Sequence, residues 1–232
     1  MSGTIFLIPV TLGGTDFSKV IPEKVITLTK NLRFFIVEDI RSARRFLRLI
    51  DKNFPIDDTI FFELNEHTGE TDIAHFLEPV LNGSDTGIMS EAGLPGIADP
   101  GSRIIAMAHK KKITVTPLSG PSSIILALIS SGFNGQNFTF NGYLPVKQPE
   151  RSAKLRELEK NCDSGYSQIF METPYRNQKM FESIIEICHN DTELCIASDI
   201  TLPSESIRTA KISEWKRNIP SLNDKLVIFV LQ

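Results

Sequence analysis

The most informative stretch of the sequence runs Ser90-Glu91-Ala92-Gly93-Leu94-Pro95-Gly96-Ile97-Ala98-Asp99-Pro100-Gly101. It follows a short apolar run at 87–90 and precedes the apolar stripe of a helix at 103–111. Its glycines and prolines predict a rigid loop whose backbone can approach a ligand closely. The alternative is a plain strand-to-helix turn with Asp99 near the helix start. Because such turns need only about two to six residues, the length favours a ligand-binding loop.

Short apolar runs alternate with amphipathic stretches on both sides of this loop. Strands are expected at 5–8, 34–37, 60–63, 87–90 and 114–117, and helices at 23–31, 42–51, 71–81 and 103–111. Such alternation predicts a mostly parallel sheet with helices on both faces. Ligands of these sheets bind beyond the carboxyl ends of the strands, so the loops that follow the strands are the candidate site.

In the second half of the sequence the predicted strands and helices alternate less regularly. Strands are expected at 138–141, 168–172, 194–197, 207–212 and 225–231, and helices at 124–131, 150–161 and 177–189. Several of these strands follow one another directly, which predicts a mixed sheet in a separate α/β domain. We therefore expect two domains, 1–118 and 119–232, with a ligand cleft between them.

Composition limits the class of protein. The chain has 232 residues, of which 41% are hydrophobic and 23% charged, as in globular proteins. Its net charge of −3 gives no overall basic field, so any site for a polyanion must be local. Cys162, Cys188 and Cys195 have neither CxxC nor metal-ligand spacing, which indicates a reducing compartment without structural metal or disulfides. The apolar run at 5–10 is too short for a signal peptide or membrane span. These features predict a soluble, cytoplasmic protein.

Charged residues follow the second predicted strand. Glu38 and Asp39 stand at its end, and arginines follow at positions 41, 44, 45 and 48, on one face of a helix. Such a stripe is often a solvated face with pairing inside the helix. Four arginines without a lysine, next to a candidate site, favour binding of an anionic substrate instead.

Three further loops carry polar groups. Ser122 and Ser123 open a helix, where they can cap it or hold a carboxylate or ribose of a ligand. Glu66 and His67 follow another strand, where either can act as a general base, although His67 can equally be an exposed loop residue. In the second half, Glu172-Thr173-Pro174-Tyr175-Arg176 and Ser198-Asp199-Ile200-Thr201 follow strands in the same way.

Several motifs are absent. No GxGxxG follows the first strand, and neither GxxxxGK[ST] nor GxSxG occurs. These absences disfavour a dinucleotide-binding fold, a P-loop nucleotidase and an α/β-hydrolase.

Six motifs in a fixed order resemble one known family. They are EDIRSARRFL from Glu38, EHT from Glu66, SEAGLPGIADPG from Ser90, SGPSS from Ser119, GYLPVK from Gly142 and ETPYR from Glu172. The set resembles the tetrapyrrole methylase superfamily, the class III S-adenosylmethionine-dependent methyltransferases. It is most similar to the branch that includes the 16S ribosomal RNA cytidine 2′-O-methyltransferases. One departure is the first loop, Pro9-Val10-Thr11-Leu12-Gly13-Gly14, where the family usually has TPIGN.

The resemblance implies a two-domain α/β fold, S-adenosylmethionine bound between the domains, and a homodimer. Carried over by motif, the cofactor contacts are Pro9, Glu91, Ala92, Gly93, Pro95, Gly96, Ile97, Ser122, Ser123, Tyr143, Leu144, Glu172, Thr173, Ile200 and Thr201.

The expected reaction is methylation of a ribose 2′-hydroxyl in RNA, with the small ribosomal subunit as the partner. The candidate catalytic residues are Glu38, Arg41, Glu66 and His67, and Arg44 and Arg176 are candidates for holding substrate phosphates. Two alternatives stay open: a methyltransferase for a tetrapyrrole or another small acidic substrate, and a regulatory module that binds S-adenosylmethionine without catalysis.

Overall fold

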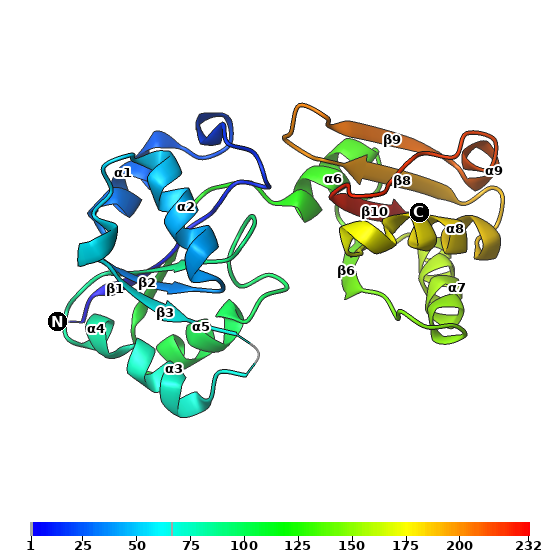
Figure 1. The fold of residues 1–232 in the computed structure, drawn as a ribbon. Helices are drawn as coiled ribbons and strands as arrows, with labels where there is room; N and C mark the ends of the chain where they lie inside the picture. The colour runs from blue at the N-terminus through cyan, green and yellow to red at the C-terminus, as the bar shows by residue number, and fades with distance from the viewer. Residues whose placement is uncertain (1, 66) are drawn as a thin grey trace. The chain divides into compact units, whose positions relative to one another are not determined.

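The computed structural model describes residues 2–65 and 67–232. Within them the chain divides into two units, Met1–Ser122 and Ser123–Gln232. The boundary falls slightly later than the division after residue 118 expected from the sequence. Each unit contains a five-stranded sheet with its own helices (Figure 1), and each is described by itself below.

The first unit is built on a parallel sheet. Its strands are β1 (Thr4–Leu7), β2 (Phe34–Val37), β3 (Ile60–Glu63), β4 (Thr86–Met89) and β5 (Thr114–Pro117). They lie in the order β3-β2-β4-β1-β5, and every neighbouring pair is parallel. All five strands were predicted to within one residue, and the parallel arrangement is confirmed.

Helices cover both faces of this sheet. They are η1 (Phe17–Lys19), α1 (Glu23–Asn31), α2 (Ile40–Ile50), η2 (Ile56–Asp58), α3 (Glu70–Phe76), α4 (Glu78–Leu81) and α5 (Gly101–Lys110). Figure 1 shows α1 and α2 on one face and α3, α4 and α5 on the other. The single helix predicted at 71–81 is wrong, because the chain forms two helices that meet at Leu77. Pro79 has no N–H to continue the first helix and is tolerated in the first turn of the second.

The core of the first unit forms two layers separated by the sheet. Phe35 and Val37 of β2 pack with Leu47 of α2 on one face. Ile36, between them in sequence, packs with Ile73 and Ile104 on the other. Strands that are covered on both faces have continuous apolar sequences, which is why these runs were recognisable.

The second unit has a mixed sheet, as predicted. Its strands are β6 (Phe138–Tyr143), β7 (Ser167–Met171), β8 (Glu193–Ser198), β9 (Ser206–Lys211) and β10 (Val227–Leu231), in the order β6-β7-β10-β8-β9. Only β6 and β7 are parallel, and the other neighbouring pairs are antiparallel.

Its helices are α6 (Ser123–Ser131), α7 (Glu150–Asp163), η3 (Pro174–Arg176), α8 (Asn177–Ile187) and α9 (Ile212–Trp215). The helix α6 packs against β8, β9 and β10, whereas α7 packs against β7, β10 and α8. The four-residue helix α9 was not predicted, because it is too short to show a helical period. It places Trp215 in the core, where the indole N–H donates to the carbonyl oxygen of Leu194 at 2.9 Å.

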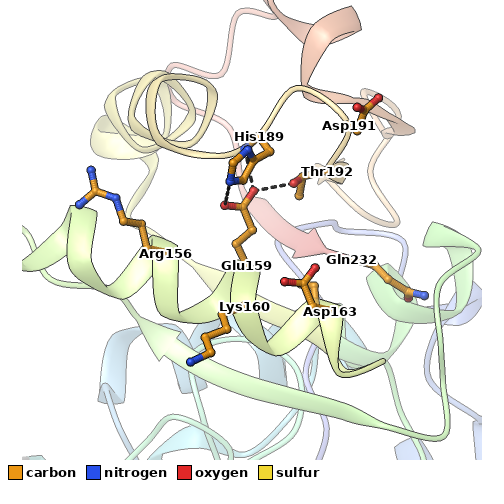
Figure 2. A pocket seen from close by; sticks show the side chains of 9 residues that line it. Arg156, Glu159, Lys160, Asp163, His189, Asp191, Thr192 and Gln232 are labelled. Carbon is orange, nitrogen blue, oxygen red and sulfur yellow. Dashed lines mark hydrogen bonds and ion pairs between the residues drawn. The ribbon is translucent and has the colours of Figure 1, made fainter.

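A carboxylate ties α7 to the turn between α8 and β8. Glu159 Oε1 accepts from the backbone N–H of His189 at 2.7 Å and from the Thr192 hydroxyl at 2.5 Å. Its side chain is only 12% exposed. Figure 2 shows these residues around a pocket that Arg156, Lys160, Asp163 and Gln232 also line. The pocket adjoins the start of β8, so it lies at the opposite end of that strand from Asp199.

Replacing Glu159 tests this contact. We expect Glu159→Ala to lower the free energy of unfolding by about 2 kcal/mol, because two hydrogen bonds to a charged carboxylate are lost. Glu157 on the same helix is the matched control, since its side chain is exposed and its ion pair with Lys154 is open to solvent. Glu157→Ala should cost less than about 1 kcal/mol. Urea denaturation measures both; equal losses would contradict the role given to Glu159.

None of the described helices has both the length and the apolar character that a membrane span requires.

Candidate functional site

The glycine- and proline-rich loop connects β4 to α5 in the first unit. Its backbone takes left-handed conformations at Gly93 (φ +71°), Gly96 (φ +89°) and Ala98 (φ +58°). A side chain at Gly93 would be strained by this φ, and its Cβ would lie 3.2 Å from Leu12. Ile97, between two of these positions, is 45% exposed and projects an apolar surface from the loop.

Asp99 organises the end of this loop. Its carboxylate accepts from the N–H of Gly96 at 2.9 Å and from the N–H of Gly101, the first residue of α5, at 2.7 Å. Burial raises the pKa of Asp99, and the two hydrogen bonds oppose that rise. Asp99 therefore does stand at the helix start, as the plain-turn alternative held, but it also closes the loop that precedes the helix.

The loop after β1 contacts both the β4–α5 loop and the loop after β5. Val10 donates its N–H to the carbonyl oxygen of Gly93 at 2.9 Å. Gly120 lies directly on Pro9, so that a Cβ at position 120 would stand only 2.5 Å from Cγ of the proline. The Pro9 side chain is consequently buried. Three loops that are far apart in sequence thus form one surface at the carboxyl edge of the sheet.

Carboxylates gather at the end of β2. Glu38 Oε2 accepts from the N–H of Glu91 at 3.4 Å, and Ser42 donates to Glu91 Oε1 at 3.3 Å. Burial raises the pKa of Glu38, and the nearby carboxylates of Glu91, Asp99 and Asp39 raise it further, whereas the hydrogen bond from Glu91 lowers it. A small pocket is lined by Glu38 and Asp99, together with Ser90 and Pro95.

His67 lies in a tight turn after β3. Asn65 Oδ1 accepts from the N–H of His67 at 2.9 Å, and Thr68 Oγ1 accepts from the N–H of Asn65 at 3.0 Å. Arg103, in the first turn of α5, donates to the carbonyl oxygen of Thr68 at 2.6 Å. His67 itself is exposed. Glu66, the other candidate base in this turn, lies outside the described residues.

The two arginines predicted near this edge, Arg41 and Arg44, are exposed on α2. The Arg44 guanidinium stands over the Phe61 ring, 5.3 Å from its centroid. The helix starts two residues earlier than predicted, because Asp39 caps it by accepting from the N–H of Ser42 at 2.6 Å.

In the second unit, Glu172 is the centre of a compact arrangement at the end of β7. Its Oε1 accepts from Arg176 Nη2 at 2.6 Å and from the N–H of Thr173 at 2.7 Å, and the carboxylate side chain is almost fully buried. Tyr143, at the end of β6, is 56% exposed, whereas Leu144 beside it is buried.

A second turn follows β8. Asp199 Oδ1 accepts from the N–H of Leu226 at 3.0 Å, and Oδ2 accepts from the Ser204 hydroxyl at 3.0 Å. Asp199 (φ +51°) and Thr201 (φ +72°) both have left-handed backbones. Ile200 between them is buried and Thr201 is partly exposed.

The structure brings together some of the candidate residues and leaves others apart. Glu38 and Glu91 are in contact, and so are Glu172, Thr173 and Arg176. Ser122 and Ser123 lie at the junction with α6, partly exposed. Ala92 is exposed, whereas Gly93 and Pro95 are buried.

Sequence reasoning gave no part to Gly120 or Arg103, and it named Asp199 only within the loop at 198–201. Gly120 stands inside a quoted motif, but its contact with Pro9 joins residues far apart in the chain. Among the described residues, no group of three or more His, Cys, Asp or Glu side chains is arranged to hold a metal ion.

The fold is that of known methyltransferases. The structure described as the methyltransferase CobJ matches it with a TM-score of 0.65 and 15% sequence identity, over 99% of this chain and 94% of that one. The two-domain α/β architecture expected from the sequence is thereby confirmed.

Residues 21–216 match the family model of the Tetrapyrrole (Corrin/Porphyrin) Methylases, and the chain belongs to this family. This confirms the resemblance drawn from the six motifs, and the protein is a methyltransferase.

Its relatives include proteins called Ribosomal RNA small subunit methyltransferase I. The one from Vibrio cholerae is 27% identical over 90% of this chain and 69% of its own length. The one from Streptococcus pyogenes serotype M3 is 29% identical over 92% of this chain and 70% of its own. The one from Pseudomonas aeruginosa is 25% identical over 92% and 72%.

A methyl group added at Gly120 tests the contact between the loops after β1 and β5. We expect Gly120→Ala to destabilise the fold by about 1–3 kcal/mol, because the new Cβ overlaps the rigid Pro9 ring. Gly135→Ala is the control, since a Cβ there has no atom within 4 Å. Thermal unfolding compares the two. An unchanged melting temperature in Gly120→Ala would mean that the loops do not depend on each other.

The raised pKa of Glu38 predicts a pH dependence. In the folded state Glu38 retains its proton at higher pH than in the unfolded chain, so its contribution to stability is lost as pH rises through the folded pKa. We expect Glu38→Gln to melt at a higher temperature than the parent chain at pH 7, with the difference shrinking toward pH 4. Glu63→Gln, at the exposed end of β3, is the control. A difference independent of pH would contradict the raised pKa.

Proposed function

We propose that this protein transfers the methyl group of S-adenosylmethionine to a ribose 2′-hydroxyl in small-subunit ribosomal RNA. The observation that carries the proposal is the similarity to relatives called Ribosomal RNA small subunit methyltransferase I over nine-tenths of the chain. The likeness to CobJ, at 15% identity, concerns the fold alone and supports no particular acceptor.

The residues of the first unit fit a cofactor with a nucleoside, a sulfonium and an amino acid end. The glycines of the β4–α5 loop leave its backbone open to a ligand, and exposed Ile97 offers an apolar contact. The exposed carboxylate of Glu91 can pair with a cation. On the first unit we propose that the contacts are Pro9, Glu91, Ala92, Gly93, Pro95, Gly96, Ile97 and Ser122.

The second unit would add Ser123 and the residues that follow β6, β7 and β8. These are Tyr143, Leu144, Glu172, Thr173, Ile200 and Thr201. The hydrogen bonds at Glu172 and Asp199 hold the last two of these turns in one conformation, which favours binding because less freedom is lost.

The bound cofactor supplies an electrophilic methyl group, and the chain must do the rest. Its side chains must align the acceptor oxygen, exclude water and remove the hydroxyl proton. Glu38 suits the last task, because it is half-buried at the carboxyl end of β2 and has a raised pKa. His67 and Glu66 are the other proposed bases, and Arg41, Arg44 and Arg176 are proposed to hold phosphates of the substrate.

An RNA acceptor in the small ribosomal subunit implies a cytoplasmic enzyme, and we extend the proposal to this location. We also propose a homodimer, which rests on the family resemblance; size-exclusion chromatography with light scattering tests it.

Transfer of labelled methyl groups to small ribosomal subunits tests the function. We expect incorporation into RNA at ribose, found as an alkali-resistant dinucleotide, and none into tetrapyrroles. Glu38→Gln should reduce the rate constant about 100-fold or more, with an unchanged dissociation constant for S-adenosylmethionine in calorimetry. Glu63→Gln should keep full activity.

Three other results would contradict the proposal. Methylation of a tetrapyrrole in place of RNA would make the protein an enzyme for small acidic substrates. Cofactor binding without transfer to any acceptor would favour the regulatory module. If the folded protein does not bind S-adenosylmethionine, the RNA methyltransferase, the small-substrate methyltransferase and the regulatory module are all contradicted.

A further inference from the structure

The arginines of α2 form a continuous row of positive charge on one face of the helix. Arg41, Arg44, Arg45 and Arg48 are all exposed on this helix. Within residues 2–65 and 67–232, none of the four has a carboxylate at ion-pair distance. Arg41 and Arg45 are near enough to Asp39 to contribute to its lowered pKa, after the hydrogen bonds from Ser42 that lower it most. The pairing inside the helix that usually neutralises such stripes is therefore missing.

Three of the four side chains are nevertheless held in place, by neutral partners. The Arg44 guanidinium stands over the Phe61 ring. Arg45 Nη2 donates to the Ser42 hydroxyl at 3.2 Å, and Arg48 Nη1 donates to the carbonyl oxygen of Lys52 at 2.6 Å. These contacts restrict the rotamers without cancelling the charge, so less side-chain entropy is lost when an anion binds.

The row of arginines begins with Arg41, close to the candidate site, and extends along α2 to Arg48. Arg41 is three residues after Glu38, and Ser42, one residue further, donates to Glu91 of the β4–α5 loop. From Arg41 to Arg48 the helix advances roughly 10 Å. A single small anion at the pocket cannot reach all four guanidinium groups, whereas an extended polyanion can.

We propose that this row, Arg41, Arg44, Arg45 and Arg48, binds the phosphate backbone of the RNA strand and brings the acceptor ribose to the edge of the sheet where Glu38 stands. The inference rests on the proposed function and adds to it the surface that holds the substrate. Because the whole chain has a net charge of −3, the attraction must come from such a local patch. Contacts to phosphates hold a strand in register without reading its sequence.

A double variant tests the row without touching the residues proposed for catalysis. Arg45→Ala/Arg48→Ala removes two charges from α2. Its matched control is Arg156→Ala/Lys160→Ala, which removes two charges from helix α7 of the second unit, beside the pocket in Figure 2. The affinity of each protein for a fluorescent fragment of small-subunit ribosomal RNA is measured by anisotropy at several salt concentrations.

We expect the slope of log affinity against log salt to fall by about two in the α2 variant, one unit for each lost phosphate contact. The control should keep the parent slope. In methyl transfer, the α2 variant should show a raised KM for RNA, an unchanged kcat at saturating RNA and an unchanged affinity for S-adenosylmethionine. Circular dichroism compares the total helix content of each variant with that of the parent protein.

The outcomes separate this inference from the function on which it rests. If the parent protein methylates RNA but the α2 variant binds RNA with the parent slope, the row is not the RNA surface and the function stands. If the slope of log affinity against log salt falls equally in both double variants, RNA binds diffusely over the surface and the inference is overturned. If the parent protein methylates a small acidic substrate only, the proposed function fails and the inference fails with it.

Discussion

The carboxylate of Asp99, held between the N–H groups of Gly96 and Gly101, is the contact on which the candidate site depends. A loop with two left-handed glycines has many conformations open to it, and the partly buried carboxylate of Asp99 restricts them by joining the N–H groups of Gly96 and Gly101. The same carboxylate stands at the first turn of α5, where the helix dipole favours negative charge. The end of the loop is therefore held by an ionisable group whose burial raises its pKa, and the hydrogen bond from Val10 to Gly93 holds its start.

Charge is divided sharply at the carboxyl edge of the first sheet. Glu38 and Asp99 line the small pocket and Glu91 contacts Glu38, whereas the arginines of α2 extend away from these carboxylates. Ser42 joins the two groups through its hydrogen bonds with Glu91 and Arg45. This arrangement suits an enzyme that removes a proton at one point while it holds a long anionic substrate elsewhere. It would also let a chain of net negative charge bind RNA, as we propose.

Much of the fold could be predicted, because buried strands and amphipathic helices leave periodic patterns in the sequence. All ten strands were predicted to within one or two residues. The prediction of one helix at 71–81 was wrong. The apolar period continues through Pro79, but the helical hydrogen bonds cannot, because proline has no backbone N–H. The four-residue helix α9 carries no period at all. The family could be inferred from motif order, and the loops of the site followed from the ends of predicted strands.

The amino-acid sequence by itself determined the two kinds of sheet, the glycine-rich loop and the basic stripe, since each depends on residues that are neighbours along the chain or along one helix. Only the tertiary structure decided which of these groups meet. The contacts of Gly120 with Pro9, of Glu91 with Glu38 and of Arg44 with Phe61 join distant segments. The conformational preferences of single residues do not reveal contacts between distant segments, because these contacts form only when the elements pack together in three dimensions.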